Sequence, residues 1–217
     1  MDAPATPFDG SADGRDAIFR ATYRVVYEDG YAALSIKRIA DEADLSKSTI
    51  YHHFENKDEL ALEFASELTI AYLERYVSLV GGETDDALTA VERLLDLALF
   101  GDVDGERSDS DGDDATDVDR VYLEMRSRAL TDPRYRTRFQ QLDAMIRERL
   151  AALVREGIDE GTFRDVDPAA VAATLYVVLE GASLLGRTSA DREWMAAVRD
   201  QLDAYLATIT LEGGNSD

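Results

Sequence analysis

Hydrophobic residues recur every three or four positions along most of the chain, and no stretch alternates residue by residue as a half-buried strand does. This pattern predicts an all-α protein of about nine helices. The predicted helices cover about residues 13–29, 35–43, 46–53, 57–80, 84–100, 120–130, 134–156, 168–187 and 191–211.

Several predicted helix ends carry residues that begin or end helices. Ser35, Ser46 and Thr84 each precede a helical stretch, where a side-chain oxygen can accept a hydrogen bond from a free backbone N–H. Gly30 directly follows the first stretch and is expected to end it. Pro168 opens a later stretch at a position where a missing N–H costs nothing.

Two segments fall outside this helical pattern. Residues 1–12 are expected to form a flexible polar arm. Residues 101–119 carry nine acidic residues against one arginine. Such a composition buries too little apolar surface to fold, so a mobile acidic loop is predicted there. Its Asp-rich centre is faintly like a calcium loop, but the glutamate that completes such a loop is missing.

Residues 35–54 contain two short predicted helices joined by a tight turn, Ala43-Asp44-Leu45-Ser46. The apolar residues are spaced to pack the two helices on each other; they are Ile36, Ile39, Ala40, Leu45 and Ile50. This is the pattern of a helix-turn-helix, whose second helix enters the major groove of DNA. The outward positions of the second helix hold Lys47, Ser48, Thr49, Tyr51 and His52, which suit phosphates and base edges.

The segment from about Asp13 to Leu62 resembles the DNA-binding domain of the tetracycline-repressor (TetR) family. The shared positions are Ile39-Ala40, Ala43, Ser46, Thr49, Tyr51-His52-His53-Phe54 and Lys57-Asp58-Glu59-Leu60. Two positions depart from the family pattern. Asp44 stands where the turn usually has Gly, and Ser48 stands where Gly or Ala is common. Because Asp tolerates a left-handed backbone better than most residues, the turn is expected to survive.

The resemblance implies DNA-binding roles for individual residues. Thr49 and Tyr51 would contact the DNA backbone and base edges, and His53 and Lys57 would hold phosphates. Lys47 is either a phosphate contact or a solvated surface lysine. The predicted DNA-binding set is Ser46, Lys47, Ser48, Thr49, Tyr51, His52, His53 and Lys57. Phe54 is expected in the core. The two histidines are neighbours on a helix, so no metal site is predicted, and no cofactor.

The resemblance also implies two domains, with DNA binding in residues 13–60 and ligand binding and dimerisation in residues 61–211. A homodimer is expected through the last two helices, whose apolar stripes are Val171, Leu175, Val178, Leu179, Ala182 and Leu185, and Trp194, Val198, Leu202, Tyr205 and Leu206. These stripes could instead pack within their own chain. Candidates to line a ligand pocket are Tyr72, Tyr76, Leu94, Leu97, Phe100, Tyr122, Met125, Met145 and Tyr176. Glu180, in an apolar run, points to a polar or cationic small-molecule effector.

The chain is strongly acidic, with a net charge of −22. Asp provides 28 of the 45 acidic residues, and only three of the 23 basic residues are Lys. Such surfaces resemble those of proteins from salt-loving microbes, which favours a halophilic archaeal source, because salt screens the repulsion between like charges. The three lysines all lie within residues 37–57, and the window 31–57 carries four basic and four acidic residues. A neutral window in so acidic a chain is where a polyanion would bind.

These features predict a cytoplasmic transcriptional regulator, a homodimeric repressor that binds a palindromic DNA operator and is released by a small molecule. The chain has no cysteine, no long uninterrupted apolar run and no signal-peptide pattern, so neither a disulfide scaffold nor a membrane partner is expected. An enzyme is disfavoured because no reactive constellation is visible. A helical protein-interaction module that uses the acidic segment is the remaining alternative.

Overall fold

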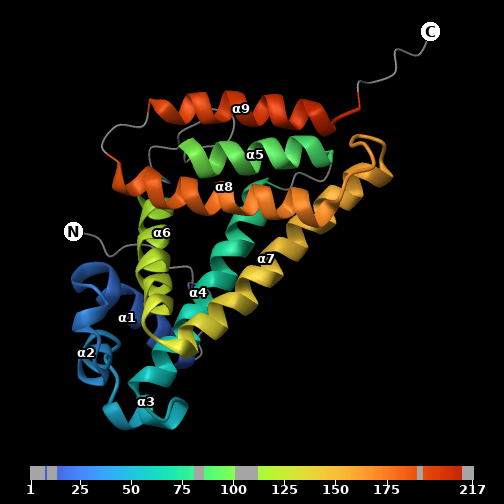
Figure 1. Cartoon of the computed structure of the whole chain (residues 1–217). Coiled ribbons are helices and arrows are strands. Elements are labelled where there is room, and N and C mark those ends of the chain that lie inside the picture. The colour runs from blue at the N-terminus through green and yellow to red at the C-terminus, as the bar shows by residue number, and fades with distance from the viewer. Residues whose placement is uncertain (1–7, 9–13, 81–85, 101–111, 190–192, 212–217) are drawn as a thin grey trace. The chain divides into compact units, whose positions relative to one another are not determined.

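The computed structural model describes residue 8 and residues 14–80, 86–100, 112–189 and 193–211 (Figure 1). The described residues form α-helices and two short 3-10 helices, with no β-structure among them except one isolated bridge between Phe163 and Thr210. The predicted all-α class is confirmed. The elements are α1 (Gly14–Asp29), η1 (Tyr31–Ala33), α2 (Ile36–Glu42), α3 (Lys47–His53), α4 (Lys57–Val80), α5 (Ala87–Phe100), α6 (Gly112–Ser127), η2 (Arg128–Leu130), α7 (Pro133–Asp159), α8 (Pro168–Thr188) and α9 (Trp194–Ile209).

The predicted acidic loop at residues 101–119 is wrong in its second part, because Gly112–Asp119 belongs to α6. The helix is anchored by apolar residues on one face, where Val118, Val121, Tyr122 and Met125 are all buried. Acidic residues are also favourable in the first turn of a helix, where the dipole is positive. Residues 101–111 lie outside the part of the chain that the structure describes.

The start of α5 also differs from the prediction. The helix begins at Ala87, and the carboxylate of Asp86 accepts a hydrogen bond from the backbone N–H of Thr89 at 2.8 Å. That bond lowers the pKa of Asp86. Asp86 therefore caps the start of α5, the role predicted for Thr84, which lies outside the described residues.

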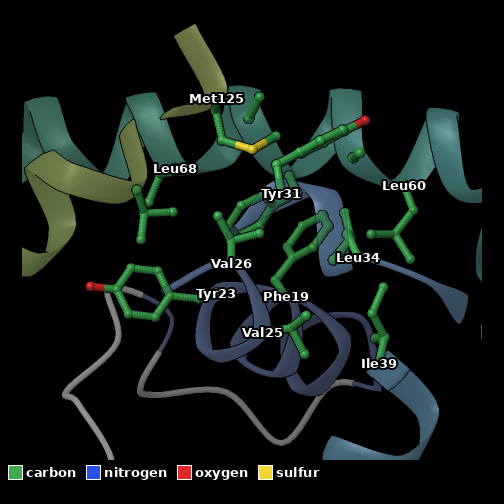
Figure 2. Close-up of a cluster of buried hydrophobic side chains, with 14 of the residues drawn as sticks. Phe19, Tyr23, Val25, Val26, Tyr31, Leu34, Ile39, Leu60, Leu68 and Met125 are labelled. Atoms are coloured by element: carbon green, nitrogen blue, oxygen red, sulfur yellow. The ribbon is translucent and has the colours of Figure 1, made fainter. Parts of the chain in front are cut away.

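The chain forms two compact units, and unit 1 comprises residues 1–74 and 113–142. Its core is built on α1, where Ile18, Phe19 and Val26 are at most 2% exposed. Figure 2 shows part of this core, in which side chains of α1, Tyr31 and the helix α4 meet Met125 of α6. Phe8, within the predicted flexible arm, packs its ring 5.6 Å from that of Phe19. The rest of the arm before Asp13 is outside the described residues.

Unit 2 comprises residues 75–112 and 143–217. Within it α5 runs alongside α8 and α9 (Figure 1). The contact is partly electrostatic, because Arg199 of α9 donates from Nε to Asp96 of α5 at 2.6 Å. After α7, Arg164 N–H donates to the carbonyl of Ile209 at 2.7 Å, and Leu211 N–H donates to that of Thr162 at 2.9 Å. These bonds fix the end of α9 to the connection between α7 and α8.

The apolar stripes expected at a dimer interface pack largely within the chain. The buried members of these stripes are Val171, Leu175, Ala182, Leu202 and Leu206. Two members of the stripes are exposed, Leu185 of α8 (44%) and Trp194 of α9 (39%), and Val177 (70%) and Leu184 (47%) of α8 are exposed as well. The buried members thus pack within their own chain, and because α8 is apolar on more than one face, spacing alone cannot tell which face turns inward.

The stretch Pro168–Gly186 of α8 is long and apolar enough to cross a membrane by length and composition alone, with a mean hydropathy of 1.6. The core helix of a globular protein meets the same criterion, and 33% of this stretch is buried within the protein. The exposed apolar surface of α8 is therefore not explained by packing within the chain.

Candidate nucleic-acid interface

The two short helices of the candidate interface begin where the sequence predicted. Ser35 accepts a hydrogen bond from the backbone N–H of Arg38 at 3.2 Å, and Ser46 accepts one from that of Thr49 at 3.1 Å. Each serine thereby satisfies one of the free N–H groups at a helix start. The predicted capping roles of Ser35 and Ser46 are confirmed.

The turn between the helices depends on Asp44. This residue has a φ of 53°, the only positive φ among the described residues other than glycine. The expectation that Asp44 takes the left-handed conformation usually given to glycine is therefore confirmed. Ile39, Ala40 and Ile50 are at most 3% exposed, and they pack α2 and α3 together.

The helix α3 presents nearly all its polar side chains outward. Lys47, Ser48, Tyr51, His52 and His53 are exposed, with Tyr51 at 54%, whereas Ile50 on the opposite side is fully buried. The outward positions predicted from the sequence are therefore accessible.

A cluster of hydroxyl groups lies at the start of α3. The Oγ of Ser46 is 2.7 Å from the Oγ of Ser48 and 2.9 Å from the Oγ1 of Thr49. Ser46 and Ser48 are exposed, and Thr49 is half-buried. Hydroxyls of this kind donate to phosphate oxygens and to base edges in protein–DNA contacts.

The other end of α3 is held by aromatic packing. Phe54 is only 2% exposed, as predicted, and its ring lies 5.7 Å from that of Phe19 in α1. The guanidinium of Arg15 lies over both rings, at 5.2 Å from Phe19 and 5.6 Å from Phe54. Arg15 also pairs with Glu63 of α4 at 2.5 Å. The orientation of α3 is therefore fixed by both α1 and α4.

The basic residues around α3 have different partners. Arg38 forms a salt bridge with Asp29, so its charge is largely neutralised within the fold. Lys37 and Lys47 are exposed, and neither has an ion-pair partner among the described residues. Lys57, the first residue of α4, is half-buried, and its Nζ lies 5.4 Å from the ring centre of Tyr31. Lys37 and Tyr31 were not among the predicted site residues.

The candidate ligand-pocket residues are divided between the two compact units. Tyr122 and Met125 belong to the hydrophobic core of unit 1, with at most 1% exposure. The guanidinium of Arg126 packs on the ring of Phe139 at 5.3 Å and donates to the hydroxyl of Tyr122 at 3.1 Å. Tyr122 and Met125 therefore pack in the core of unit 1. The side chain of Tyr72 lies outside the part of the chain that the structure describes, as does that of Tyr76.

The remaining pocket candidates lie in unit 2. Leu97 is buried, Phe100 and Glu180 are half-buried, and Met145 is 42% exposed. Tyr176 is 8% exposed, and its hydroxyl donates to Asp143 at 2.7 Å. An apolar recess between α5, α7 and α8 is lined by one candidate, Leu94, together with Val91, Leu95, Leu150, Leu175 and Leu179. The recess has essentially no interior volume, so no cavity for a ligand is formed there.

The capped helices, the left-handed turn and the exposed polar face of α3 define a helix-turn-helix protein that binds DNA. Residues 18–64 match the family described as "Bacterial regulatory proteins, tetR family". Residues 110–211 match "BetI-type transcriptional repressor, C-terminal". The chain belongs to the TetR family and is a DNA-binding transcriptional regulator.

Individual relatives agree with this assignment. A TetR transcription regulator from Haloarcula marismortui is 30% identical, with 93% of this chain and 100% of that chain covered and a TM-score of 0.73. The "HTH-type transcriptional repressor AcnR" of Corynebacterium jeikeium is 29% identical over 85% of each chain. The protein of the same name from Corynebacterium glutamicum is 24% identical over 91% of this chain and 95% of its own.

Proposed function

We propose that this regulator is a repressor that acts as a homodimer on a palindromic operator and is released by a small molecule. The observation that carries the proposal is the outward face of α3, with Tyr51 at 54% exposure above a fully buried Ile50. The related repressors from Corynebacterium support repression rather than activation. No catalytic activity is part of the proposal.

The side chains of α3 have distinct proposed roles. Tyr51 and Thr49 read base edges and the adjacent backbone, because an exposed ring and a hydroxyl suit both. Lys47 and His53 neutralise phosphates on either side. The remaining contacts are assigned to the hydroxyls of Ser46 and Ser48, to His52, and to the ammonium of Lys57 at the start of α4.

The dimer interface is proposed on the exposed face of α8 and α9. The α8 positions Thr174, Val177 and Leu184 are exposed, and with the half-buried Gly181 they follow a spacing of three and four residues. The α9 positions Trp194 and Ala197 are exposed as well. Such spacing with small residues suits a four-helix bundle made by two subunits. A dimer explains why α8 is more apolar than its burial within one chain requires.

The effector is proposed to bind in unit 2, near the apolar recess lined by α5, α7 and α8. The half-buried carboxylate of Glu180 on α8 favours a polar or cationic compound. Release follows if the effector binds one helix arrangement better than another, because a ligand shifts an equilibrium only by its differential affinity.

The protein is proposed to work in the salt-rich cytoplasm of a halophile. A dimer would carry a charge of −44, twice the −22 of one chain, and would meet a polyanion with few basic residues. Concentrated KCl screens that repulsion. Affinity would then depend more on hydroxyl, aromatic and water-mediated contacts than on counterion release.

The test is a fluorescence anisotropy titration in molar KCl with labelled DNA from upstream of the protein's own gene and random DNA as competitor. The proposal predicts saturable binding of two subunits per palindrome that random DNA does not displace. Binding with no preference over random DNA would contradict it. The bound complex then provides the assay in which candidate effectors are screened for release.

A further inference from the structure

Tyr31 is held in unit 1 by three side chains from the α6–η2–α7 segment. Its backbone N–H donates to Oε1 of Glu124 at 2.5 Å. Its hydroxyl lies 3.4 Å from the hydroxyl of Tyr135, and the guanidinium of Arg128 lies 4.4 Å from its ring centre. Tyr31 itself is only 9% exposed. Contacts on the backbone, the ring and the hydroxyl leave this side chain little freedom.

Gly30 makes the contact with Glu124 possible. It has a φ of +77°, a conformation that side-chain-bearing residues rarely adopt. A Cβ at this position would also lie 3.1 Å from the carboxylate oxygen that accepts the Tyr31 bond. Both the backbone conformation and the space at residue 30 therefore serve the Glu124–Tyr31 contact.

The ring of Tyr31 lies close to the side chains of two basic residues, Arg128 and Lys57. Burial and the hydrogen bond with Tyr31 raise the pKa of Tyr135 well above its ordinary value, so the hydroxyl of Tyr135 remains protonated. The Nε of Arg128 is buried and has no hydrogen-bond partner among the described residues, so its contact with the ring matters for its placement. A guanidinium within about 6 Å of an aromatic face is attracted to it.

The ammonium of Lys57 approaches the same ring. Its Nζ lies 5.4 Å from the ring centre of Tyr31. The neighbouring carboxylate, Asp58, pairs with Arg134 at 3.1 Å, and Arg134 also pairs with Asp132 at 2.8 Å. A carboxylate partner would neutralise the lysine, whereas an aromatic ring orients the ammonium and leaves its charge available to a phosphate.

We propose that Tyr31 is the positioning residue for the phosphate contact of Lys57, and that Glu124 and Arg128 hold it in that role. The inference rests on the proposed DNA binding, in which Lys57 contacts a phosphate. It adds that the strength of this contact is set by Glu124 of α6 and Arg128 of η2, which lie 67 and 71 positions after Lys57 in the chain. A rearrangement of α6 and η2 would thus change one specific phosphate contact through one ring.

The test measures binding to a labelled random-sequence duplex, since phosphate contacts are independent of sequence. Lys57→Ala is expected to lower the affinity about tenfold and to change the slope of log affinity against log salt by about one. Tyr31→Leu is expected to have a similar effect. In the double variant the loss should equal that of Lys57→Ala alone, because a ring with no ammonium to position contributes nothing further.

Arg128→Gln removes the guanidinium that contacts the ring of Tyr31 but keeps the ring itself. It therefore tests the positioning role even if Tyr31→Leu fails to fold. It is expected to lower the affinity about threefold and to shift the salt slope in the same direction as Lys57→Ala. The matched control is Arg120→Gln, because Arg120 lies on α6, the helix directly before η2, and also lies over a tyrosine, 5.4 Å from the ring centre of Tyr27. Both variants remove one positive charge, but the control should leave the slope unchanged. Tyr31→Phe keeps the ring and should keep most of the affinity.

The outcomes separate the inference from the proposed function. Losses that multiply in the Tyr31→Leu/Lys57→Ala variant, or equal effects of Arg128→Gln and Arg120→Gln, overturn the positioning role while DNA binding stands. Wild-type affinity in Lys57→Ala overturns the phosphate contact and with it the inference. Failure of the wild-type protein to bind any duplex overturns the proposed function itself.

Discussion

The backbone N–H of Leu45 donates to the carbonyl of Ala40 at 2.9 Å, across the left-handed residue Asp44. This bond and the one from the N–H of Ala43 to the carbonyl of Ile39 end α2 in an arrangement that usually has glycine at the left-handed position. Asp44→Gly should therefore raise the free energy of unfolding by ~0.5–1 kcal/mol, because it removes the cost of a side chain in this conformation. Asp44→Val should lower it by ~1–2 kcal/mol.

Chemical unfolding in concentrated KCl measures both changes. The matched control is Asp41→Val, which removes the same charge from an exposed position three residues earlier, within α2. Its cost should be a few tenths of a kcal/mol, set by the lower helix propensity of valine. Equal effects at residues 41 and 44 would show that charge, not backbone conformation, matters at the turn.

The helix-turn-helix could be predicted in detail because its signals are local. Ser35 and Ser46 precede the helices that they cap, and the apolar spacing identifies Ile39, Ala40 and Ile50 as the contact between them. The role of Asp44 follows from the conformational tolerance of one residue type. The DNA contacts of the outward residues remain predictions.

Longer-range features could not be predicted from spacing. The Glu124–Tyr31 hydrogen bond joins residues 93 positions apart, and no local pattern indicates it. A concentration of arginines in residues 120–138, six in an otherwise acidic chain, was the available signal for Arg128. The start of α6 could not be predicted because its acidic first turn has the composition of a solvated loop, although Val118 in the next turn is buried.

The proposed dimer face predicts that a charge in its centre prevents association. Val177→Glu should convert the protein to a monomer, because an unpaired carboxylate is costly to bury in an apolar interface. Sedimentation velocity in molar KCl measures the change. Leu130→Glu is the control, since Leu130 is 80% exposed but belongs to η2. A dimeric Val177→Glu variant would place the interface elsewhere.

Glu92 gives a pH-dependent prediction. Burial raises its pKa, and although Arg199 opposes this shift, Asp203 and Asp96 add to it. A carboxyl whose pKa is higher in the folded than in the unfolded state destabilises the fold at pH values above both, and this penalty disappears as the pH falls through the folded-state pKa. Glu92→Gln should therefore raise the melting temperature at neutral pH.

Thermal unfolding at neutral and at acid pH checks that prediction. The gain from Glu92→Gln should shrink as the pH falls, whereas Glu156→Gln, an exposed change on α7, should have little effect at either pH. A gain from Glu92→Gln that persists unchanged in acid would contradict the role assigned to burial.

The most direct test of the central claim, that α3 and the start of α4 bind the operator, is the affinity of the Tyr51→Ala/Lys57→Ala variant for DNA from upstream of the gene. Fluorescence anisotropy in molar KCl, with helix content and oligomeric state compared alongside, is the measurement. A loss of about a hundredfold or more, down to the affinity for random DNA, is the predicted result. Unchanged affinity in a folded variant would contradict the assignment of this helix as the DNA-reading element.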